Sequence, residues 1–415
     1  MRAKAIIISI GDEILYGQTL DTNSHWISGE LDKVGIKVLK KLTIADNRNE
    51  ILESFKQAKE EADIVLITGG LGPTTDDLTK PLLAEFFGVS MVMNEDALEE
   101  VTQLFARSGR EMSEANRGQA ELPSNCTKIT NSLGTAPGMW FDEENIIFIA
   151  MPGVPYEMKR MMELTLLPKL VERYVDGVIY HKVIKTIGIP ESKLAAKIAE
   201  VADNLPDTIK LAYLPSYGQV KLRLTSTGPD FQQLKFETDK VVKAMLPLIE
   251  TYVYGYDDDE IEAVIGSLLM DRNCTLGTAE SCTGGNVAAL ITSVAGSSRY
   301  YQGSIISYDN RIKIEQLNVN KELIHSHGAV SEEVVCQMAN GVRERLGVDI
   351  GLATSGIAGP DGGTADKPVG TIWIAYADKD KTIAKKLQLT KDRKLNITFT
   401  SYALLNLLRL NIFSI

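Results

Sequence analysis

Gly- and Ser-rich segments in the last third of the chain carry the residue types of an anion-binding site. They are Thr278–Gly285, Gly296–Ser304, Ser307–Lys313 and Ala353–Pro360. The first follows an apolar strand pattern and opens a helix, so its amides and hydroxyls would face an anion at the strand end. Together the segments predict an enzyme that holds a phosphorylated small molecule.

A serine in these segments would need a base other than histidine. None of the four histidines of the chain lies in or beside them. A lysine in a partly dry pocket loses proton affinity and can accept a proton from a hydroxyl, with a tyrosine as relay. Tyr308 and Lys313 lie five residues apart, which fits a strand end followed by the first turn of a helix. Lysine-assisted hydrolysis is therefore the predicted chemistry.

The run Thr-Ala-Glu-Ser-Cys-Thr-Gly-Gly at 278–285, with Ser-Gly-Ile-Ala-Gly-Pro at 355–360, resembles the C-terminal domain of the CinA family. That domain also occurs alone as the nicotinamide-mononucleotide (NMN) deamidase. The resemblance covers Ala279–Thr371 and implies hydrolysis of the nicotinamide carboxamide to nicotinic acid mononucleotide and ammonia, without a cofactor. It implies Ser298 as nucleophile, Lys313 as base and Tyr308 as relay. The substrate would be held by Ser281, Thr283, Gly284, Gln302, Thr354, Ser355, Gly356 and Arg393, with Gln302 orienting the carboxamide.

Several of these residues also have structural interpretations. Ser298 could cap a helix, Lys313 could be a solvated helix lysine, and Glu280 could cap the helix dipole without a catalytic duty. Cys282 suits a small packing residue better than a nucleophile. Family members commonly carry a second arginine about four residues after the position of Arg393, where this chain has Asn396-Ile397. Either a phosphate anchor is missing, or Lys391, Arg393 and Lys394 replace it.

Loops in the first third of the chain carry a second candidate site. They are Gly11–Gly17, Ala45–Asn47 and Thr68–Thr79, each after a predicted strand. Glycines after a strand let the backbone approach an anion, and carboxylates beside a phosphate usually act through a divalent cation. A structural tight turn, with Asp76 and Asp77 as a helix N-cap pair, is the alternative.

The run Thr68-Gly69-Gly70-x-Gly72-Pro73 followed by Asp77-x-Thr79 resembles the molybdopterin-binding fold and the N-terminal domain of the CinA family. The resemblance extends through 116–120, 131–138 and 151–155. It implies a metal-dependent ADP-ribose pyrophosphatase. A vestigial ligand-binding domain, which would carry the same glycines, is the alternative. The nucleotide would bind at Gly69, Gly70, Gly72 and Thr74, and a divalent metal at Asp46, Asp76 and Asp77.

The order of the predicted elements gives the fold class. Strands and helices alternate over 1–170, which predicts a parallel sheet in a three-layer α/β/α domain like the molybdopterin-binding fold. Residues 171–255 predict a small α+β linker domain, and 256–415 an α/β module, the deamidase by resemblance. The acidic stretch Asp257–Glu260 between them is typical of a solvated linker or a helix start.

Composition limits the partners. A formal net charge of -11 argues against a surface that tracks nucleic acid. The first apolar run has six residues, Ala5–Ile10, too few for a signal peptide or a membrane span, so the cytoplasm is expected. The expected partners are NMN and ADP-ribose, and the family resemblance adds a homodimer. A competence-associated scaffold that docks a recombinase such as RecA, with vestigial catalytic sites, is the alternative function.

Overall fold

Tertiary contacts in the computed structural model divide the chain into two units. The structure describes residues 3–74, 76–109, 111–174 and 177–412. The first unit runs to Tyr180 and includes Thr227–Leu234, and the second contains His181–Ser226 and everything from Lys235 onward. Most of the middle segment thus belongs with the C-terminal module. No helix in the described ranges combines the length and the apolar character needed to cross a membrane.

The first unit is built on a six-stranded sheet in the order β2-β1-β3-β8-β7-β6. Its strands are β1 (Lys4–Ile10), β2 (Lys37–Ile44), β3 (Ile64–Thr68), β6 (Thr127–Ile129), β7 (Gly138–Glu143) and β8 (Ile146–Met151). The first four in spatial order are parallel, and β7 and β6 pair antiparallel. The apolar run in β1 is buried from Ala5 to Ile10, as expected for a strand covered on both faces.

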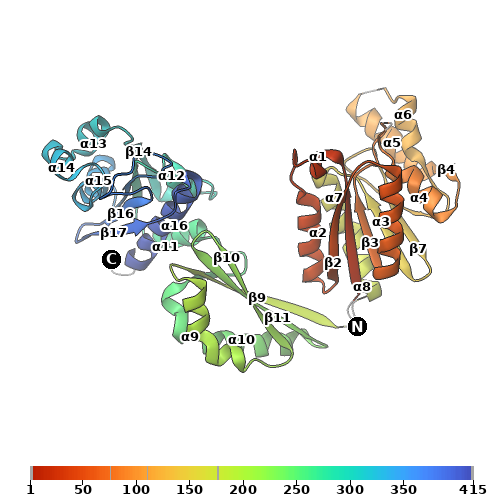
Figure 1. Cartoon of the computed structure of the whole chain (residues 1–415), viewed down its shortest axis with the longest axis horizontal. Helices are drawn as coiled ribbons and strands as arrows, with labels where there is room; N and C mark the ends of the chain where they lie inside the picture. The colour runs from red at the N-terminus through yellow and green to blue at the C-terminus, as the bar shows by residue number, and fades with distance from the viewer. Residues whose placement is uncertain (1–2, 75, 110, 175–176, 413–415) are drawn as a thin grey trace. The chain divides into compact units, whose positions relative to one another are not determined.

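Helices cover both faces of this sheet (Figure 1). One layer contains α2 (Thr22–Lys33), α7 (Pro155–Met161) and α8 (Leu167–Tyr174), and the other α3 (Arg48–Glu61), α4 (Thr79–Phe87) and α5 (Glu95–Ser108). Alternate β1 residues serve the two layers, since Ile7 packs in the cluster of Ile27 and Ile8 in that of Phe55. The predicted three-layer α/β/α arrangement is confirmed. Shorter elements are α1 (Asp12–Leu15), α6 (Glu114–Arg117), β4 (Met91–Met93) and β5 (Glu121–Pro123).

The second unit begins with a four-stranded sheet in the order β10-β11-β9-β12. Its elements are β9 (Val178–Ile187), α9 (Glu191–Asp203), β10 (Ile209–Ser216), β11 (Gln219–Gly228), α10 (Phe231–Ile249) and β12 (Val253–Tyr256). Both helices lie on one face of the strands (Figure 1), where Leu194, Leu222 and Met245 share one buried cluster. This is the small α+β domain that the sequence predicts.

A five-stranded sheet in the order β14-β13-β15-β16-β17 forms the C-terminal module. Its strands are β13 (Leu276–Glu280), β14 (Tyr301–Ile306), β15 (Ile350–Gly356), β16 (Thr371–Ala377) and β17 (Thr382–Gln388). The first three in spatial order are parallel, and β16 pairs antiparallel with both β15 and β17. β17 therefore runs in the same direction as β15 and ends at the same edge of the sheet as the parallel strands, a few residues before Arg393.

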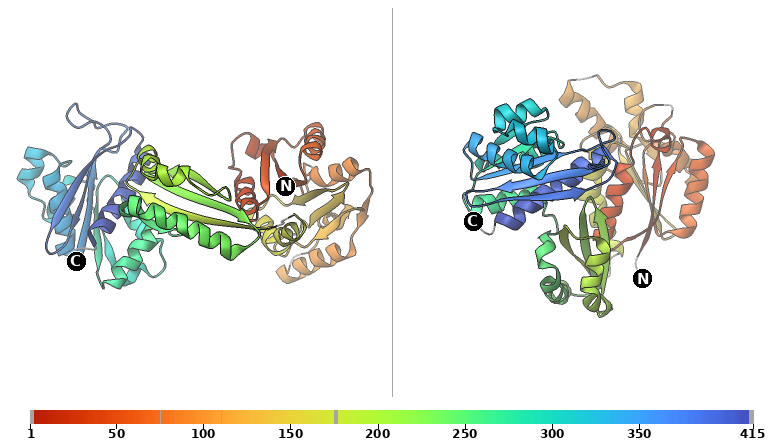
Figure 2. Two further views of the ribbon diagram at one scale, coloured as in Figure 1. Left: turned by 90° about the horizontal axis from the view of Figure 1, so that it is seen from below. Right: turned by 60° about the vertical axis from the view of Figure 1, so that its left-hand side comes forward.

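Helices sandwich this sheet as well (Figure 2). On one face lie α11 (Ile261–Asp271), α12 (Asn286–Thr292) and α16 (Arg393–Asn411), and on the other α13 (Asn310–Leu317), α14 (Lys321–His327) and α15 (Glu332–Leu346). The C-terminal α/β fold is confirmed.

The middle domain and the C-terminal module share side-chain packing. Arg409, near the end of α16, is 7% exposed and donates to the carbonyls of Thr251 (2.6 Å) and Val253 (2.9 Å). Tyr254 belongs to the same apolar cluster as Leu404. The acidic stretch 257–260 is more than a solvated linker, because Lys185 donates to Glu260 at 2.9 Å, and helix α11 starts directly after it.

Two glycines let α15 pack closely. A Cβ at Gly341 would lie 2.0 Å from the carbonyl oxygen of Leu317, and one at Gly351 would lie 2.0 Å from that of Ala339. Neither backbone atom can move without displacing a helix or strand. The spacing between α15, α13 and β15 is therefore fixed by the missing side chains.

Substitutions at helix glycines should have opposite effects in the two units. We expect Gly341→Ala to lower the free energy of unfolding of the second unit by about 1–3 kcal/mol through overpacking, and so to lower its thermal midpoint. The matched change Gly29→Ala, in α2, meets nothing within 4 Å and should stabilise the first unit by about 0.5–1 kcal/mol. Calorimetry of each full-length variant measures both. A neutral Gly341→Ala would contradict the close packing.

Candidate active sites

The parallel strands of the C-terminal module end at one sheet edge, and a cavity of about 230 Å³ lies there. Glu280, Ile306 and Gly356 are the last residues of β13, β14 and β15. The cavity is lined by Ser281, Cys282, Tyr308, Asn310, Lys313, Ala329, Val330, Ser355, Gly356, Ala358 and Arg393. This is the edge at which open α/β sheets bind ligands.

Lys313 places a buried amine beside a serine hydroxyl. The residue is 1% exposed, and its Nζ donates to Ser281 Oγ at 3.2 Å. The same Nζ reaches the carbonyls of Ser307 (2.7 Å) and Tyr308 (3.2 Å). Burial lowers the pKa of Lys313, although the nearby Asp309 carboxylate opposes that shift. A lysine of lowered pKa in contact with a serine can act as its general base.

The structure does not bring the predicted nucleophile, Ser298, to its predicted base, Lys313. It lies exposed in a 3₁₀ turn before the first residue of β14, whereas Lys313 Nζ lies against the residue that follows the strand. Six strand residues span about 20 Å. Gln302, the second residue of β14, is also exposed and does not line the cavity. Ser281 takes the place beside Lys313 that the sequence analysis gave to Ser298.

The predicted relay, Tyr308, lines the cavity, but its hydroxyl is directed to Arg393 and not to Lys313. Tyr308 is 59% exposed, and its hydroxyl accepts a hydrogen bond from Arg393 Nη2 at 2.9 Å. Only its backbone carbonyl meets Lys313. Arg393 also donates to the Gly359 carbonyl at 2.9 Å, so it reaches the cavity rim from the first turn of α16. The pair forms a rim, in which the guanidinium is a cation that lines the cavity.

Thr283, Thr354 and Ser355 are buried and use their hydroxyls within the protein. Thr283 Oγ1 lies 2.8 Å from Thr354 Oγ1, and Ser355 Oγ donates to the Ala329 carbonyl at 2.6 Å. Of the residues predicted to hold the substrate, Ser281, Ser355, Gly356 and Arg393 line the cavity, whereas Thr283, Gly284 and Thr354 do not. Burial raises the pKa of the Cys282 thiol to about 12, so that thiol stays protonated, as a packing residue would.

Asn396 explains the missing second arginine. It is fully buried, its Nδ2 donates to the carbonyls of Ala358 and Thr390 at 2.9 Å each, and Ile397 packs against the core. Neither position faces the cavity, so among the predicted substitutes only Arg393 lines it.

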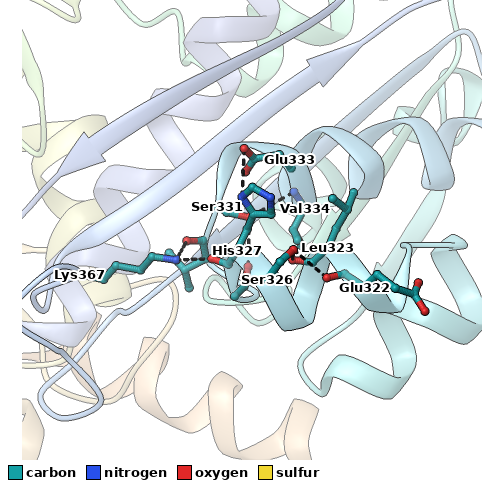
Figure 3. A network of polar contacts seen from close by, with 10 residues as sticks. Glu322, Leu323, Ser326, His327, Ser331, Glu333, Val334 and Lys367 are labelled. Atoms are coloured by element: carbon teal, nitrogen blue, oxygen red, sulfur yellow. Dashed lines mark hydrogen bonds and ion pairs between the residues drawn. The ribbon is translucent and has the colours of Figure 1, made fainter.

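The turn at 328–330 forms a cavity wall that the sequence analysis missed. Lys367 Nζ donates to the carbonyls of His327 (2.5 Å) and Val330 (2.8 Å), as Figure 3 shows. The Gly328 carbonyl accepts from Ser331 Oγ at 3.0 Å. With the Ala329 contact to Ser355, each carbonyl from 327 to 330 is bound by a side chain. Gly328, standing between two helical patterns, was the only sequence signal for this turn.

The N-terminal unit holds a pocket of about 430 Å³ at the corresponding sheet edge. The predicted Gly69, Gly70, Gly72, Asp46, Asp76 and Asp77 line it, and Thr74 does not. Gly69 and Gly70 have φ of 105° and 65°, which L side chains rarely adopt. Glu157, which the sequence analysis missed, also lines the pocket, is 7% exposed and accepts from Asn131 Nδ2 at 2.6 Å.

One of the three predicted metal ligands, Asp77, is used by its own loop. Asp77 Oδ2 accepts from the Thr74 amide at 3.0 Å and so braces the loop. Burial, together with the Asp12, Glu13 and Asp76 carboxylates, raises the pKa of Asp46. Across the described ranges no group of three Asp, Glu, His or Cys side chains is arranged to hold a metal ion. The pocket is acidic, and the Asp76 carboxylate is near enough to Asp46 to raise its pKa.

Three family models together match nearly the whole chain. They are the probable molybdopterin binding domain over 6–172, the damage-inducible protein CinA KH domain over 181–255 and the CinA C-terminal domain over 258–412. A CinA-like protein of Cytophaga hutchinsonii is 52% identical over 405 residues, covering 98% of this chain and 97% of the relative. The chain belongs to the CinA family.

Other CinA relatives are similarly complete. A putative competence-damage inducible protein of Halothermothrix orenii is 40% identical over 398 residues, 96% of each chain. Among solved structures, the protein CinA with unknown function from Thermoplasma acidophilum is 33% identical, with a TM-score of 0.38 over 41% of this chain and 98% of that one. The competence/damage inducible protein CihA from Agrobacterium tumefaciens is 32% identical, with a TM-score of 0.35 over 36% and 93%.

Removing the amine that holds the 328–330 wall should loosen it. Lys367→Met deletes both carbonyl contacts, and at about 1–1.5 kcal/mol for the loss we expect about tenfold faster hydrogen exchange for amides 328–331. Lys386→Met, on the exposed face of β17, is the matched control and should leave these rates unchanged. Equal rates in the two variants would show that Lys367 does not hold the turn.

Proposed function

We propose that the C-terminal module is an amide hydrolase that converts NMN to nicotinic acid mononucleotide and ammonia. The observation that supports this most is the 3.2 Å contact between Lys313 Nζ and Ser281 Oγ inside the cavity. The carboxamide is the substrate that the resemblance to NMN deamidases implies. Ser281 is the nucleophile in this proposal, and Lys313 is its base.

The steps follow from that pair. The neutral Lys313 amine takes the Ser281 hydroxyl proton while Oγ bonds to the carboxamide carbon. The resulting ammonium returns the proton to the departing nitrogen as the C–N bond breaks, and ammonia leaves. Lys313 then takes a proton from a water whose oxygen bonds to the ester carbon, and it returns that proton to Ser281 Oγ as the C–O bond breaks and the nicotinic acid product leaves. Both half-reactions need the amine neutral at the start.

The size of the cavity orients the substrate. At about 230 Å³ it lies below the usual range for sites that enclose a whole ligand. The nicotinamide end therefore occupies it, and the phosphate lies at the rim with Arg393, whose bidentate guanidinium suits phosphate oxygens.

Alanine substitution distinguishes the two serines. We expect Ser281→Ala to lower ammonia release from NMN by at least about 10³-fold, because nucleophile removal in hydrolases costs that much or more. For Ser298→Ala, which is exposed at the other end of β14, ammonia release should stay within about twofold of the wild type.

The rate of ammonia release should rise with pH and level off below the ordinary lysine pKa, because burial lowers the pKa of Lys313.

The opposite result for the two serines would restore the original assignment. No ammonia from the wild type at any pH would instead favour the scaffold function.

We also propose that the N-terminal unit cleaves the diphosphate of ADP-ribose with a divalent cation. The supporting observation is an acidic pocket beneath a glycine loop, in which the raised pKa of Asp46 reflects burial and carboxylate neighbours that a cation would offset. Asp46 and Asp76 would hold the ion, which supplies charge neutralisation and polarisation of water. The Gly69–Gly72 amides would approach the phosphates.

Removing the cation or its ligand tests this site. We expect a chelator to abolish release of AMP from ADP-ribose, and Asp46→Asn to lower it about 100-fold in the presence of Mg²⁺, as loss of a metal-binding carboxylate does. Glu53→Gln, exposed on α3, is the control. Cleavage that survives the chelator would overturn the cation's role.

A further inference from the structure

Glu280 is a fully buried carboxylate directly before Ser281. Its Oε2 accepts from Thr283 Oγ1 (2.7 Å) and the amides of Gly285 (3.0 Å) and Val287 (3.1 Å), and its Oε1 accepts from the Ala288 amide (2.8 Å). An ionised carboxylate only accepts hydrogen bonds and has about four lone-pair sites. Glu280 thus accepts four hydrogen bonds, three at Oε2 and one at Oε1, and the three amides are those that open helix α12.

A directed chain of hydrogen bonds leads from this carboxylate to the serine. Thr283 gives its one hydroxyl proton to Glu280, so the 2.8 Å contact with Thr354 must be donated by Thr354. Thr354 Oγ1 can then only accept from the Ser281 amide, which lies 3.3 Å away and also donates to the Thr354 carbonyl at 3.1 Å. The carboxylate sets the direction of every bond in this chain.

The same contacts exclude an anion from the start of α12. The sequence analysis expected the 278–285 loop to face a phosphate, but Glu280 already binds its amides. A second negative charge there would meet a buried carboxylate at low dielectric. The cation on the cavity rim, Arg393, lies on a different element, at the start of α16.

We propose that Glu280 is a positioning residue, which fixes Ser281 against Lys313 through Thr283 and Thr354 and reserves the start of α12, so that the anionic end of the substrate binds at Arg393. This inference rests on the proposed deamidase function. Glu280 touches neither the substrate nor the reacting atoms. It acts on the reaction only indirectly, through the alignment of Ser281.

Kinetics of Glu280→Gln in the full-length protein test the proposal. The glutamine keeps the shape but turns one acceptor into a donor facing an amide. We expect kcat for NMN to fall about 10- to 100-fold, as a misplacement of about 1 Å does, with KM within about twofold. Thr283→Val should lower kcat alone in the same way. The double variant should fall little further than the worse single one, because both break one chain.

Asp378→Asn is the matched control. Asp378 is a 6% exposed carboxylate that accepts from Tyr376 and two backbone amides, but it follows β16 at the opposite sheet edge. It should lose stability without a change in kcat. An equal fall in kcat for Asp378→Asn, a raised KM for Glu280→Gln, or additive effects of Glu280→Gln and Thr283→Val would each overturn the proposal.

Hydrogen exchange separates this proposal from the proposed function. The amides of Gly285, Val287 and Ala288 should exchange slowly in the wild type and faster in Glu280→Gln, whatever the substrate. If the wild type released no ammonia, the deamidase proposal would fail while these rates still reported the capping. Unchanged exchange with normal ammonia release would reject the role of Glu280 alone.

Discussion

The C-terminal module is organised around a lysine amine enclosed at the edge of a sheet. Lys313 is 1% exposed, and an amine taken out of water must be given acceptors by the protein. The turn after β14 supplies two carbonyls, and the loop after β13 supplies a hydroxyl. The loop after β13, 32 residues earlier in the chain, is thereby fixed against the turn that directly precedes the helix of Lys313. The same burial lowers the pKa of Lys313, and a lowered pKa is what the proposed role of this lysine as a general base requires.

The two candidate sites follow one architectural rule but carry opposite charges. Each lies where parallel strands end, and each has a glycine-containing loop followed by a helix. In the N-terminal unit the carboxylates of Asp46 and Asp76 face the pocket, which therefore favours a cation. In the C-terminal module the Glu280 carboxylate is buried and accepts hydrogen bonds from the first amides of α12, and Arg393 lies on the rim of the cavity. The charged side chains that line each pocket, acidic in the first unit and basic in the C-terminal module, decide its sign.

The sequence was sufficient for the fold and for half of the C-terminal site. Uninterrupted apolar runs such as Ala5–Ile10 mark buried parallel strands, and Lys313 follows a strand end at the spacing that brings it into the pocket. The choice of nucleophile could not be made that way, because Ser281 and Ser298 lie in similar Gly/Ser-rich segments. Only strand direction shows that Ser298 precedes β14 while Ser281 follows β13. The 328–330 wall was missed because backbone carbonyls carry no sequence signature.

Helix α16 connects the rim of the C-terminal cavity with the middle domain. It begins at Arg393, ends at Asn411 and is about 28 Å long at 1.5 Å per residue. Near its end Arg409 is held by carbonyls of the middle domain. Residue 255, where the match to the CinA KH domain model ends, thus separates two family models, but the middle domain and the C-terminal module are packed together across it. In a relative that consists of the C-terminal module alone, the end of α16 faces water and must carry polar residues. The residues at the end of this helix should therefore indicate whether a module has ever had a neighbouring domain.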